Sequence, residues 1–535
     1  MRLTLILLFC IQLGCVLAQP SYEKIYSGGA AGKFNLIELG SGNIMTILVN
    51  SSSVNITGTS IADSEGLIIH SHAYTIDTFL VMQSVKRYAA NEFYFAGGYW
   101  KDSCMSTGTR RTYPVIGRMD SLGNILSVQH YALNAPECSN MAGDLHVLSG
   151  GGVIAWGTRD YRFFALKVDA AGEPAWAKRF SHKAAFQFIK ELPGGDLLAG
   201  INMDTAGAVV ARMDAEGNFL WCKSYIRPRG MVHDAVIESD DSFIITGFTD
   251  STASTNSLQP YPPSYHPHLF MMKLNGEGEV QWCKGYDSEP NLWYSRNPSR
   301  IVRSLDGNYA VLATLGQPQH NFPLRPFLMK TDLNGDTLWT RSVGANDYAY
   351  STMDLLAHSD GGYMLSGSIL GDLPAMQTGL PYIFKTDSLG HFSCQDQPHP
   401  VQVLDLFPTD SSFTLTSVDG AVAYPAFLND TIFDPIAVYD ACIVTSVPAP
   451  VHSKARRVNI RPNPTTGSFT VEFTDPLTVD SFYSVYDAVG RLLFQRPLAK
   501  GQEREEIDLS RFGKGTYLVR ITSREGVCNE RVVVQ

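Results

Sequence analysis

No stretch of this sequence is basic over enough residues to follow a nucleic-acid backbone. Its 535 residues contain 42 lysines and arginines against 52 aspartates and glutamates, a net charge of −10. Because nucleic-acid binding relies on clustered cations that neutralise phosphates, we expect no nucleic-acid partner. Beyond the N-terminal region, no segment approaches the ~18 uninterrupted apolar residues of a spanning helix, so we expect no transmembrane segment in the mature protein.

The familiar catalytic and metal-binding patterns are also missing. No Gly-x-Ser-x-Gly elbow, His-Glu-x-x-His motif or phosphate loop occurs. The oxygen-rich turn Asp332–Asp336 lacks the distal Glu of an EF-hand, so plain turn chemistry explains it better than calcium binding. His70 and His72, like His266 and His268, form close pairs, but without further ligands they favour ordinary strand or loop positions. We therefore expect no cofactor, no metal and no catalytic residue, and a protein without enzymatic activity is the favoured interpretation.

The N-terminus has the pattern of a secretory signal. Arg2 precedes an apolar run that ends at Leu13, and Ala18 completes a small-residue cleavage site. We expect residues 1–18 to be removed. Two of the nine cysteines lie in this signal, which leaves seven in a compartment that permits disulfides.

A short phrase recurs down the chain and is clearest at Lys330–Trp339. An Asp stands three residues before Gly335, a basic residue stands five before it, and a Trp follows four after it. Asp at the first and Gly at the fourth position is the signature of a tight turn, so the phrase predicts a β-hairpin. Aligned on the glycine, the seven copies lie at Gly66, Gly123, Gly172, Gly217, Gly278, Gly335 and Gly390.

A second phrase, a tight turn followed by a strand that ends in glycine, alternates with the first. It is clearest at Asp360–Gly367 and also has seven copies. Successive copies of the first phrase are 45 to 61 residues apart by subtraction of their positions, a spacing typical of propeller blades. Two hairpins make a four-stranded blade, so we predict an all-β fold with a seven-bladed β-propeller at residues 19–394.

The ring is expected to close through the two ends of this repeat region. The chain starts with a second-phrase hairpin near residue 36 and ends with a first-phrase hairpin near residue 390. We predict that these two hairpins form one blade, with Phe34–Val49 beside Pro381–Ser393. An open stack of hairpins is the alternative, and it would leave two exposed strand edges.

The first phrase resembles the tryptophan-bearing repeats of quinoprotein-type propellers and, more closely, the Asp-Gly-Trp repeats of secreted Bacteroidetes propellers. This resemblance covers roughly residues 20–394 and implies a fold, not an activity. The tryptophans of the phrase could be imagined as a cofactor-stacking set, but their repeat-locked position favours blade-to-blade packing. They are Trp176, Trp221, Trp282 and Trp339.

Three segments follow the predicted propeller. Residues 395–445 contain strand-like runs between Pro and Asp, which indicate a short β segment braced on the propeller. Residues 446–457 are rich in Pro and basic residues and are typical of a linker. In residues 458–535, strands of alternating pattern are separated by turns, which predicts a small Ig-like β-sandwich.

The last of these segments carries a Pro-Asn-Pro opening, a Tyr-Asp-x-x-Gly-Arg turn and a Gly-x-Tyr strand. The marker residues are Pro462, Asn463, Pro464, Gly490, Gly515 and Tyr517. Together they resemble the type A C-terminal sorting domain of cargo of the type IX secretion system. The resemblance implies binding to the secretion machinery, export through the periplasm and outer membrane, removal of the domain and delivery to the cell surface or the medium.

Long connectors, rich in aromatics, Pro, Ser and Asn, are predicted to lie on the face opposite the short turns. The candidate binding residues there are Tyr261, Tyr265, His266, His268, Trp293 and Tyr294. Such surfaces bind glycans, peptides or proteins, although ordinary solvated loops are an open alternative. The favoured function is a secreted, surface-delivered binding or scaffolding protein with a glycan or surface-protein partner. The alternative is a polysaccharide-active hydrolase or lyase with its site on the same face.

Two disulfides are expected from the positions of the cysteines. One joins loops of the same face and the other brackets the segment after the propeller. The expected pairs are Cys104 with Cys138 and Cys394 with Cys442. Cys222 and Cys283 occupy equivalent places in neighbouring blades, too far apart to bond, so we expect them to be free, as is Cys528.

Overall fold

The computed structural model describes most of the chain. The described residues are 21–26, 35–50, 56–75, 79–103, 110–133, 141–159, 162–203, 207–227, 230–250, 267–288, 293–294, 299–316, 324–343, 349–370, 379–394, 396–412, 414–415, 417–425, 429–432, 438–440, 458–473, 481–487, 492–523 and 526–535. They divide into two compact units, Met1–Gly371 with Thr378–Cys442, and Asp372–Gln377 with Ile443–Gln535. The predicted signal at residues 1–18 lies outside the described residues. Among those described, no helix is long and apolar enough to span a membrane.

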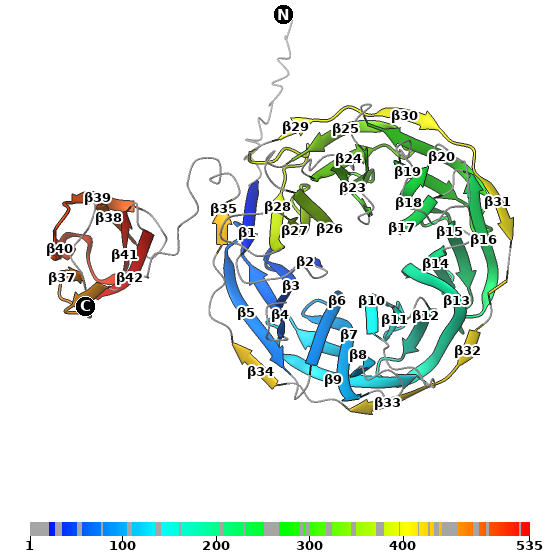
Figure 1. Ribbon diagram of the computed structural model, residues 1–535, viewed down its shortest axis with the longest axis horizontal. Coiled ribbons are helices and arrows are strands. Elements are labelled where there is room, and N and C mark those ends of the chain that lie inside the picture. Colours follow the sequence, from blue (N-terminus) through cyan, green and yellow to red (C-terminus); the bar gives the residue numbers. More distant parts are fainter. Residues whose placement is uncertain are drawn as a thin grey trace, which may run out of the picture. The chain divides into compact units, whose positions relative to one another are not determined.

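The larger unit is a ring of antiparallel sheets around a central axis (Figure 1). The strands fall into successive groups around this axis, and within a group chain order runs from the axis to the rim, except in the last group, where the N-terminal strand takes the rim position. The first groups are β2 (Leu36–Glu38), β3 (Ile44–Asn50), β4 (Ile56–Ala62) and β5 (Ile68–Thr75); then β6 (Phe79–Ala89), β7 (Glu92–Ser103), β8 (Arg110–Asp120) and β9 (Ile125–Leu133). The third group is β10 (Met141–Val147), β11 (Val153–Arg159), β12 (Arg162–Val168) and the first half of β13 (Pro174–Glu191).

The second half of β13 begins the fourth group, because this one strand pairs with β12 through its first half and with β14 through its second. The fourth group continues with β14 (Leu197–Met203), β15 (Gly207–Met213) and β16 (Phe219–Arg227). The fifth is β17 (Gly230–Ile237), β18 (Phe243–Asp250), β19 (Pro267–Leu274) and β20 (Val280–Asp287). The sixth is β21 (Trp293–Tyr294), β22 (Arg300–Arg303), β23 (Tyr309–Gly316), β24 (Arg325–Thr331) and β25 (Thr337–Ser342).

The seventh group contains β26 (Ala349–Ala357), β27 (Tyr363–Leu370), β28 (Leu380–Lys385) and β1 (Tyr22–Tyr26). The all-β, propeller-like architecture expected from the repeats is therefore confirmed. Seven as the number of blades stays a prediction. Apolar side chains between neighbouring groups form the cores, one of which joins Phe163, Phe180 and Phe186 of the third and fourth groups.

The first-phrase turns form as their residues predict. In the sixth group, the Gly335 N–H donates to the Asp332 carbonyl over 3.2 Å. The Asp332 carboxylate accepts the N–H groups of Asn334 and Asp336 over 2.9 and 2.8 Å. Gly335 has φ of 80°, a conformation that glycine adopts without the steric penalty of a side chain. Turn chemistry thus accounts for the hydrogen bonds of this carboxylate.

The ring closes through other residues than those predicted. Phe34–Val49 contains β2 and β3, which pair with each other inside the first group. The strand beside β28 is β1, with Tyr22 opposite Lys385. The last first-phrase turn, at Gly390, forms. The chain beyond it does not pair with β28 but continues as a separate segment along the rim. The edge of β28 is therefore left for the N-terminal strand.

That segment is an outer belt, which we define as β29 to β35. Its strands are β29 (Gln397–Pro398), β30 (Gln402–Asp405), β31 (Thr409–Ser412), β32 (Ser417–Asp419), β33 (Ala421–Pro425), β34 (Asn429–Ile432) and β35 (Val438–Asp440). In this order they pair antiparallel with β25, β20, β16, β13, β9, β5 and β1. Yellow to orange in Figure 1, the belt follows the rim in the direction opposite to the chain order of the groups. The expected braced β segment is thus spread around the ring and covers the outer strand edges.

The cysteines are consistent with part of the disulfide prediction. Cys222 and Cys283 are free and buried, as expected. Cys394 is disulfide-bonded. Its expected partner Cys442, and both Cys104 and Cys138, lie outside the described residues, so these two pairings stay predictions.

The smaller unit is a sandwich of two sheets, as its strand pattern predicts. One sheet is β36 (Val458–Arg461), β37 (Ser468–Phe473) and β40 (Arg504–Asp508); the other is β39 (Leu492–Leu498), β38 (Ser481–Tyr486), β41 (Gly515–Ser523) and β42 (Gly526–Val534). A short 3₁₀ turn, η2 (Ser510–Phe512), precedes β41. Both sheets contribute to one core, in which Val471 and Val519 are buried.

The marker residues of this unit have structural roles. Asn463 donates to the Arg531 carbonyl over 2.7 Å and accepts the Val533 N–H over 3.0 Å, which ties the Pro-Asn-Pro opening to the last strand. The Tyr517 hydroxyl donates to the Phe512 carbonyl over 2.8 Å. Gly490 lies outside the described residues.

Candidate functional site

We call the contact between two neighbouring groups of the ring a seam. At a seam, side chains of one group's rim strand pack on the first-phrase turn of the next group. The Trp176 indole N–H, on the rim strand of the third group, donates to the Ala215 carbonyl in the next turn over 2.9 Å. The Trp176 ring covers that turn so closely that a Cβ added to Gly217 would lie 2.8 Å from it. Trp221 repeats the arrangement, with a 3.0 Å hydrogen bond to the Gly276 carbonyl. The expectation that these tryptophans pack between blades is confirmed.

Two further positions of the rim strands complete most of the seams. Two positions after the Trp, Lys178 Nζ donates to Asn218 Oδ1 over 2.8 Å, and Lys284 forms an ion pair with Asp336. Four positions after it, a tyrosine hydroxyl donates to the carbonyl of the turn glycine over 2.6 to 2.9 Å. The pairs are Tyr26 with Gly66, Tyr74 with Gly123, Tyr131 with Gly172, Tyr225 with Gly278, and Tyr286 with Gly335. Sequence reasoning missed these tyrosines, although their fixed spacing from the Trp position is a signal that could have revealed them.

Charged side chains of alternating sign surround the central axis. Acidic residues lie on the inner strands of the third, fifth and seventh groups, and basic residues on those of the second, fourth and sixth. The acids are Asp144, Asp234 and Asp354, and the bases are Lys86, Lys190 and Arg300. The first group has the neutral Asn35 instead. Signs cannot alternate fully around an odd number of positions, and this neutral residue keeps two like charges from standing side by side.

Hydrogen bonds to the backbone hold this axial ring in place. Asp234 lies 2.7 Å from Lys190 Nζ and accepts the N–H of Ile301 in the next group over 3.2 Å. Burial opposes the ionisation of Asp234, but Lys190 and Arg300 outweigh it and keep the pKa of the carboxyl below its usual range. Burial likewise opposes the charge of Lys86, while nearby aspartates raise the pKa of its ammonium. The axial charges neutralise one another, which is a structural role.

Two histidines near the axis are neutral at physiological pH. Burial, helped by nearby cations, lowers the pKa of His233 to about 3 and that of His146 to about 4. His233 Nδ1 lies 3.2 Å from the Ser299 hydroxyl, so its ring joins the fifth and sixth groups. These imidazoles are polar bridges within the fold.

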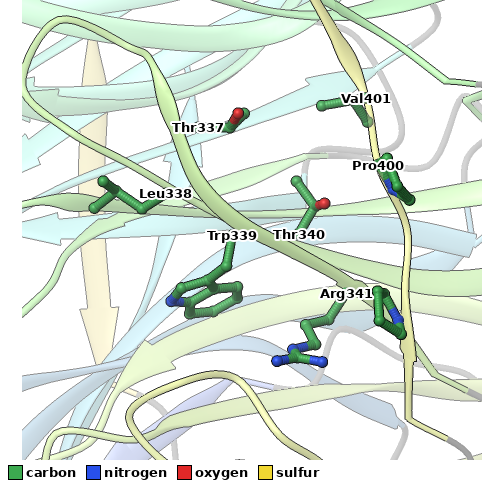
Figure 2. Close-up of a pocket in the computed structure, with 8 residues that line it drawn as sticks. Thr337, Leu338, Trp339, Thr340, Arg341, Pro400 and Val401 are labelled. Carbon is green, nitrogen blue, oxygen red and sulfur yellow. The ribbon is translucent and has the colours of Figure 1, made fainter.

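One pocket among the described residues lies at the rim, between β25 and the belt (Figure 2). Its volume is about 360 Å³. The lining residues are Thr337, Leu338, Trp339, Thr340, Arg341, Pro398, Pro400 and Val401. The prolines come from the belt, so the pocket exists only because the belt passes over β25. Sequence reasoning could not have found it from either segment alone.

The polar groups of this pocket are fixed by neighbours. The Arg341 guanidinium donates to His391 Nε2 over 2.9 Å and to Asp396 Oδ2 over 3.3 Å. Trp339 meets the Tyr363 ring edge to face, with 5.7 Å between centroids. A half-buried indole, an oriented guanidinium and threonine hydroxyls are the kind of lining that holds a small polar ligand with an apolar face, such as a sugar ring.

The predicted binding residues on the long-loop face are not brought into one described site. His268 lies in β19, is buried, and has its Nδ1 3.3 Å from Asp287 Oδ1. Trp293 and Tyr294 form β21, which pairs with β23. Tyr261, Tyr265 and His266 lie outside the described residues, so this face stays a prediction.

Comparison with known proteins identifies the smaller unit. Residues 459–535 match the family model described as a secretion system C-terminal sorting domain. The chain thus carries a C-terminal sorting domain that directs export to the cell surface or secretion, as predicted. A search of curated proteins gave no match.

Solved structures similar to this chain have low sequence identity. Hydrazine synthase from Kuenenia stuttgartiensis is 10% identical, over 64% of this chain and 96% of that one, with a TM-score of 0.42. A protein of unknown function from Dyadobacter fermentans is 12% identical over 68% and 98% of the two chains, with a TM-score of 0.38. One from Bacteroides caccae is 12% identical over 71% and 94%, with a TM-score of 0.31. At these scores none of them bears on what this chain binds.

Proposed function

We propose that this exported chain is a binding or scaffolding protein without catalysis of its own, and that the ring holds a glycan at its rim pocket. The observation that carries the proposal is the pairing of Trp339 and Arg341 under the belt. The apolar face of a sugar ring packs on an indole, and its hydroxyls accept hydrogen bonds from a guanidinium. Delivery by the sorting domain supports a partner outside the cell.

A glycan array tests the proposal. Residues 19–457 are purified, and hits are measured against Trp339→Ala. Because Trp339 also packs on a seam turn, the matched control is Trp221→Ala, which removes the equivalent indole from another seam and leaves the pocket intact. We expect the Trp339 variant to bind at least about tenfold more weakly, the loss of one aromatic anchor.

Two results would count against this assignment. If both tryptophan variants bind equally well, the pocket is not the site, and the long-loop face becomes the next candidate. If no glycan binds, the partner is of another class. A hydrolysis assay on each hit separates binding from the polysaccharide-active alternative, because release of shorter products would establish an enzyme.

A further inference from the structure

The Trp and Lys positions of the seams vary around the ring: Ser127 and Gln129 occupy them in the second group, and one other seam holds two histidines. Between the first and second groups, the Trp and Lys positions of the rim strand are occupied by His70 and His72 of β5. The rest of the seam is retained, because the Tyr74 hydroxyl still donates to the Gly123 carbonyl over 2.6 Å. The two imidazoles therefore replace the Trp and Lys side chains of a seam whose tyrosine hydrogen bond is kept.

The two histidines point their Nε2 atoms at each other. They are two residues apart on one strand and so face the same side. Their Nε2 atoms are 2.5 Å apart, with ring centroids 4.5 Å apart and the planes inclined at 64°. This separation is shorter than the ~2.9 Å that is usual for an N–H···O hydrogen bond in proteins. In the tautomer that carries its proton on Nδ1, each ring directs its Nε2 lone pair at the space between the two rings.

The surroundings orient one ring and leave the other accessible. His72 is buried, and its ring stacks on Tyr74 with 6.2 Å between centroids. Its Cδ2 would lie 3.1 Å from a Cβ added to Gly123, so the neighbouring turn limits its rotation. His70 is only partly buried and can be reached by solvent. A preoriented inner imidazole and an accessible outer one are suited to capturing an ion from solution.

We propose that His70 and His72 chelate a divalent transition metal ion, Cu²⁺ or Zn²⁺, through their Nε2 atoms. Imidazole nitrogens bind these ions at about 2.0–2.1 Å, so an ion between the rings would part the two nitrogens by less than about 1 Å. Among the described residues, no group of three His, Cys, Asp or Glu side chains is placed to hold a metal. Water therefore completes the coordination, and the site is open and exchangeable.

The chain offers a matched control for this site. The double substitution His70→Trp/His72→Lys restores the Trp-x-Lys pair of the seam at Trp176 and Lys178, so it removes the chelate while keeping a seam that the ring already uses. It retains the other 11 of the 13 histidines (13 − 2), so any adventitious binding elsewhere persists in it. The single variants His70→Gln and His72→Gln test each ligand separately.

The experiment titrates untagged, metal-free full-length chain with CuCl₂ and, separately, ZnCl₂ by calorimetry. Electron paramagnetic resonance of the Cu²⁺ form reports the number of bound nitrogens. We expect one ion per chain with two nitrogen couplings in the wild type, affinity about tenfold or more weaker in each Gln variant, and in the double variant only the weak adventitious binding of the remaining side chains. Thermal midpoints measured in chelator should show the double variant folded. Binding of equal affinity in the double variant, or no binding of either ion to the folded wild type, would overturn the proposal.

Discussion

Tyr286 shows how one hydroxyl group joins two neighbouring sheets. It is fully buried on β20 and donates to the Gly335 carbonyl of the next group over 2.7 Å. Tyr286→Phe keeps the ring but removes the donor, which leaves a buried carbonyl with one partner fewer. We expect a loss of about 1–2 kcal/mol of stability, measured by denaturant unfolding. Tyr424→Phe, at a side chain that is 46% exposed, is the control and should change the unfolding free energy little.

Glu23 makes the stability of the ring depend on pH. Burial raises its pKa from 4.5 to about 7, although hydrogen bonds from the Cys394 N–H and from Ser393 oppose the shift. Between these values the folded chain keeps a proton that the unfolded chain releases. The stability from this group is therefore complete below about pH 4.5 and falls as the pH rises through about 7.

Glu23→Gln should remove this dependence, because the amide is neutral and still accepts the Cys394 N–H. From pH 5 to pH 8, the unfolding free energy of the variant relative to wild type should rise by up to about 3 kcal/mol. The exposed Glu65→Gln is the control and should show no such change. A constant difference between Glu23→Gln and wild type across this range would show that Glu23 is not the titrating group.

Asp234 tests the axial ring. Asp234→Ala leaves Lys190 without its 2.7 Å partner near the axis, and we expect a loss of about 3 kcal/mol, seen as a lower unfolding midpoint. The double variant Lys190→Met/Asp234→Leu removes both charges and should recover most of that loss. A double variant no more stable than Asp234→Ala would mean that backbone contacts, not charge pairing, dominate at this position.

Among the elements, the belt depends on the ring for its structure, because each of its strands pairs with a strand of the ring. Its strands are short, and β31 is exposed throughout. The residue Cys394, which precedes the belt, and the last belt strand both lie at β1, because the Cys394 N–H donates to Glu23 over 2.8 Å and Asp440 pairs with Lys24. This placement supports the predicted Cys394–Cys442 bridge, which would close the belt covalently around the rim.

Removing the belt should expose the rim edges of the ring to other chains. We expect deletion of residues 396–442, with Cys394→Ser to avoid a free thiol, to lower the soluble yield and to produce oligomers or aggregates. Size-exclusion chromatography with light scattering measures this. Deletion of 458–535 alone is the matched control and should stay monodisperse. A monodisperse belt-less ring would show that the edges need no cover.

For the whole molecule, the two compact units predict separable roles. Deleting residues 458–535 should leave the ring soluble and equally heat-stable, because the ring is a compact unit of its own. The same deletion should trap the protein in the periplasm, since the sorting domain directs export. We expect the mature surface form to end within or near residues 447–457. Intact-mass measurement of released protein checks the position, and a surface form that still ends at Gln535 would contradict cleavage.

The sequence alone determined those features that depend on residues close together in the chain. Asp332 and Gly335 form their turn from contacts within five residues, so the repeats, the β-strands and the propeller-like fold could be predicted. The same holds for the sorting domain, where Asn463, Gly515 and Tyr517 mark a compact unit. Its family is recognisable because these local patterns follow one another in a fixed order.

Only the tertiary structure decided which distant segments complete each sheet. Leu36 binds Asp354 across 318 residues, and β1 rather than Phe34–Val49 takes the edge of β28. An open strand edge can accept the backbone of any extended segment, so residue patterns do not specify which segment binds it. The belt, the pocket that it forms with Trp339, and the convergence of His70 and His72 at one seam all depend on such long-range pairing and packing.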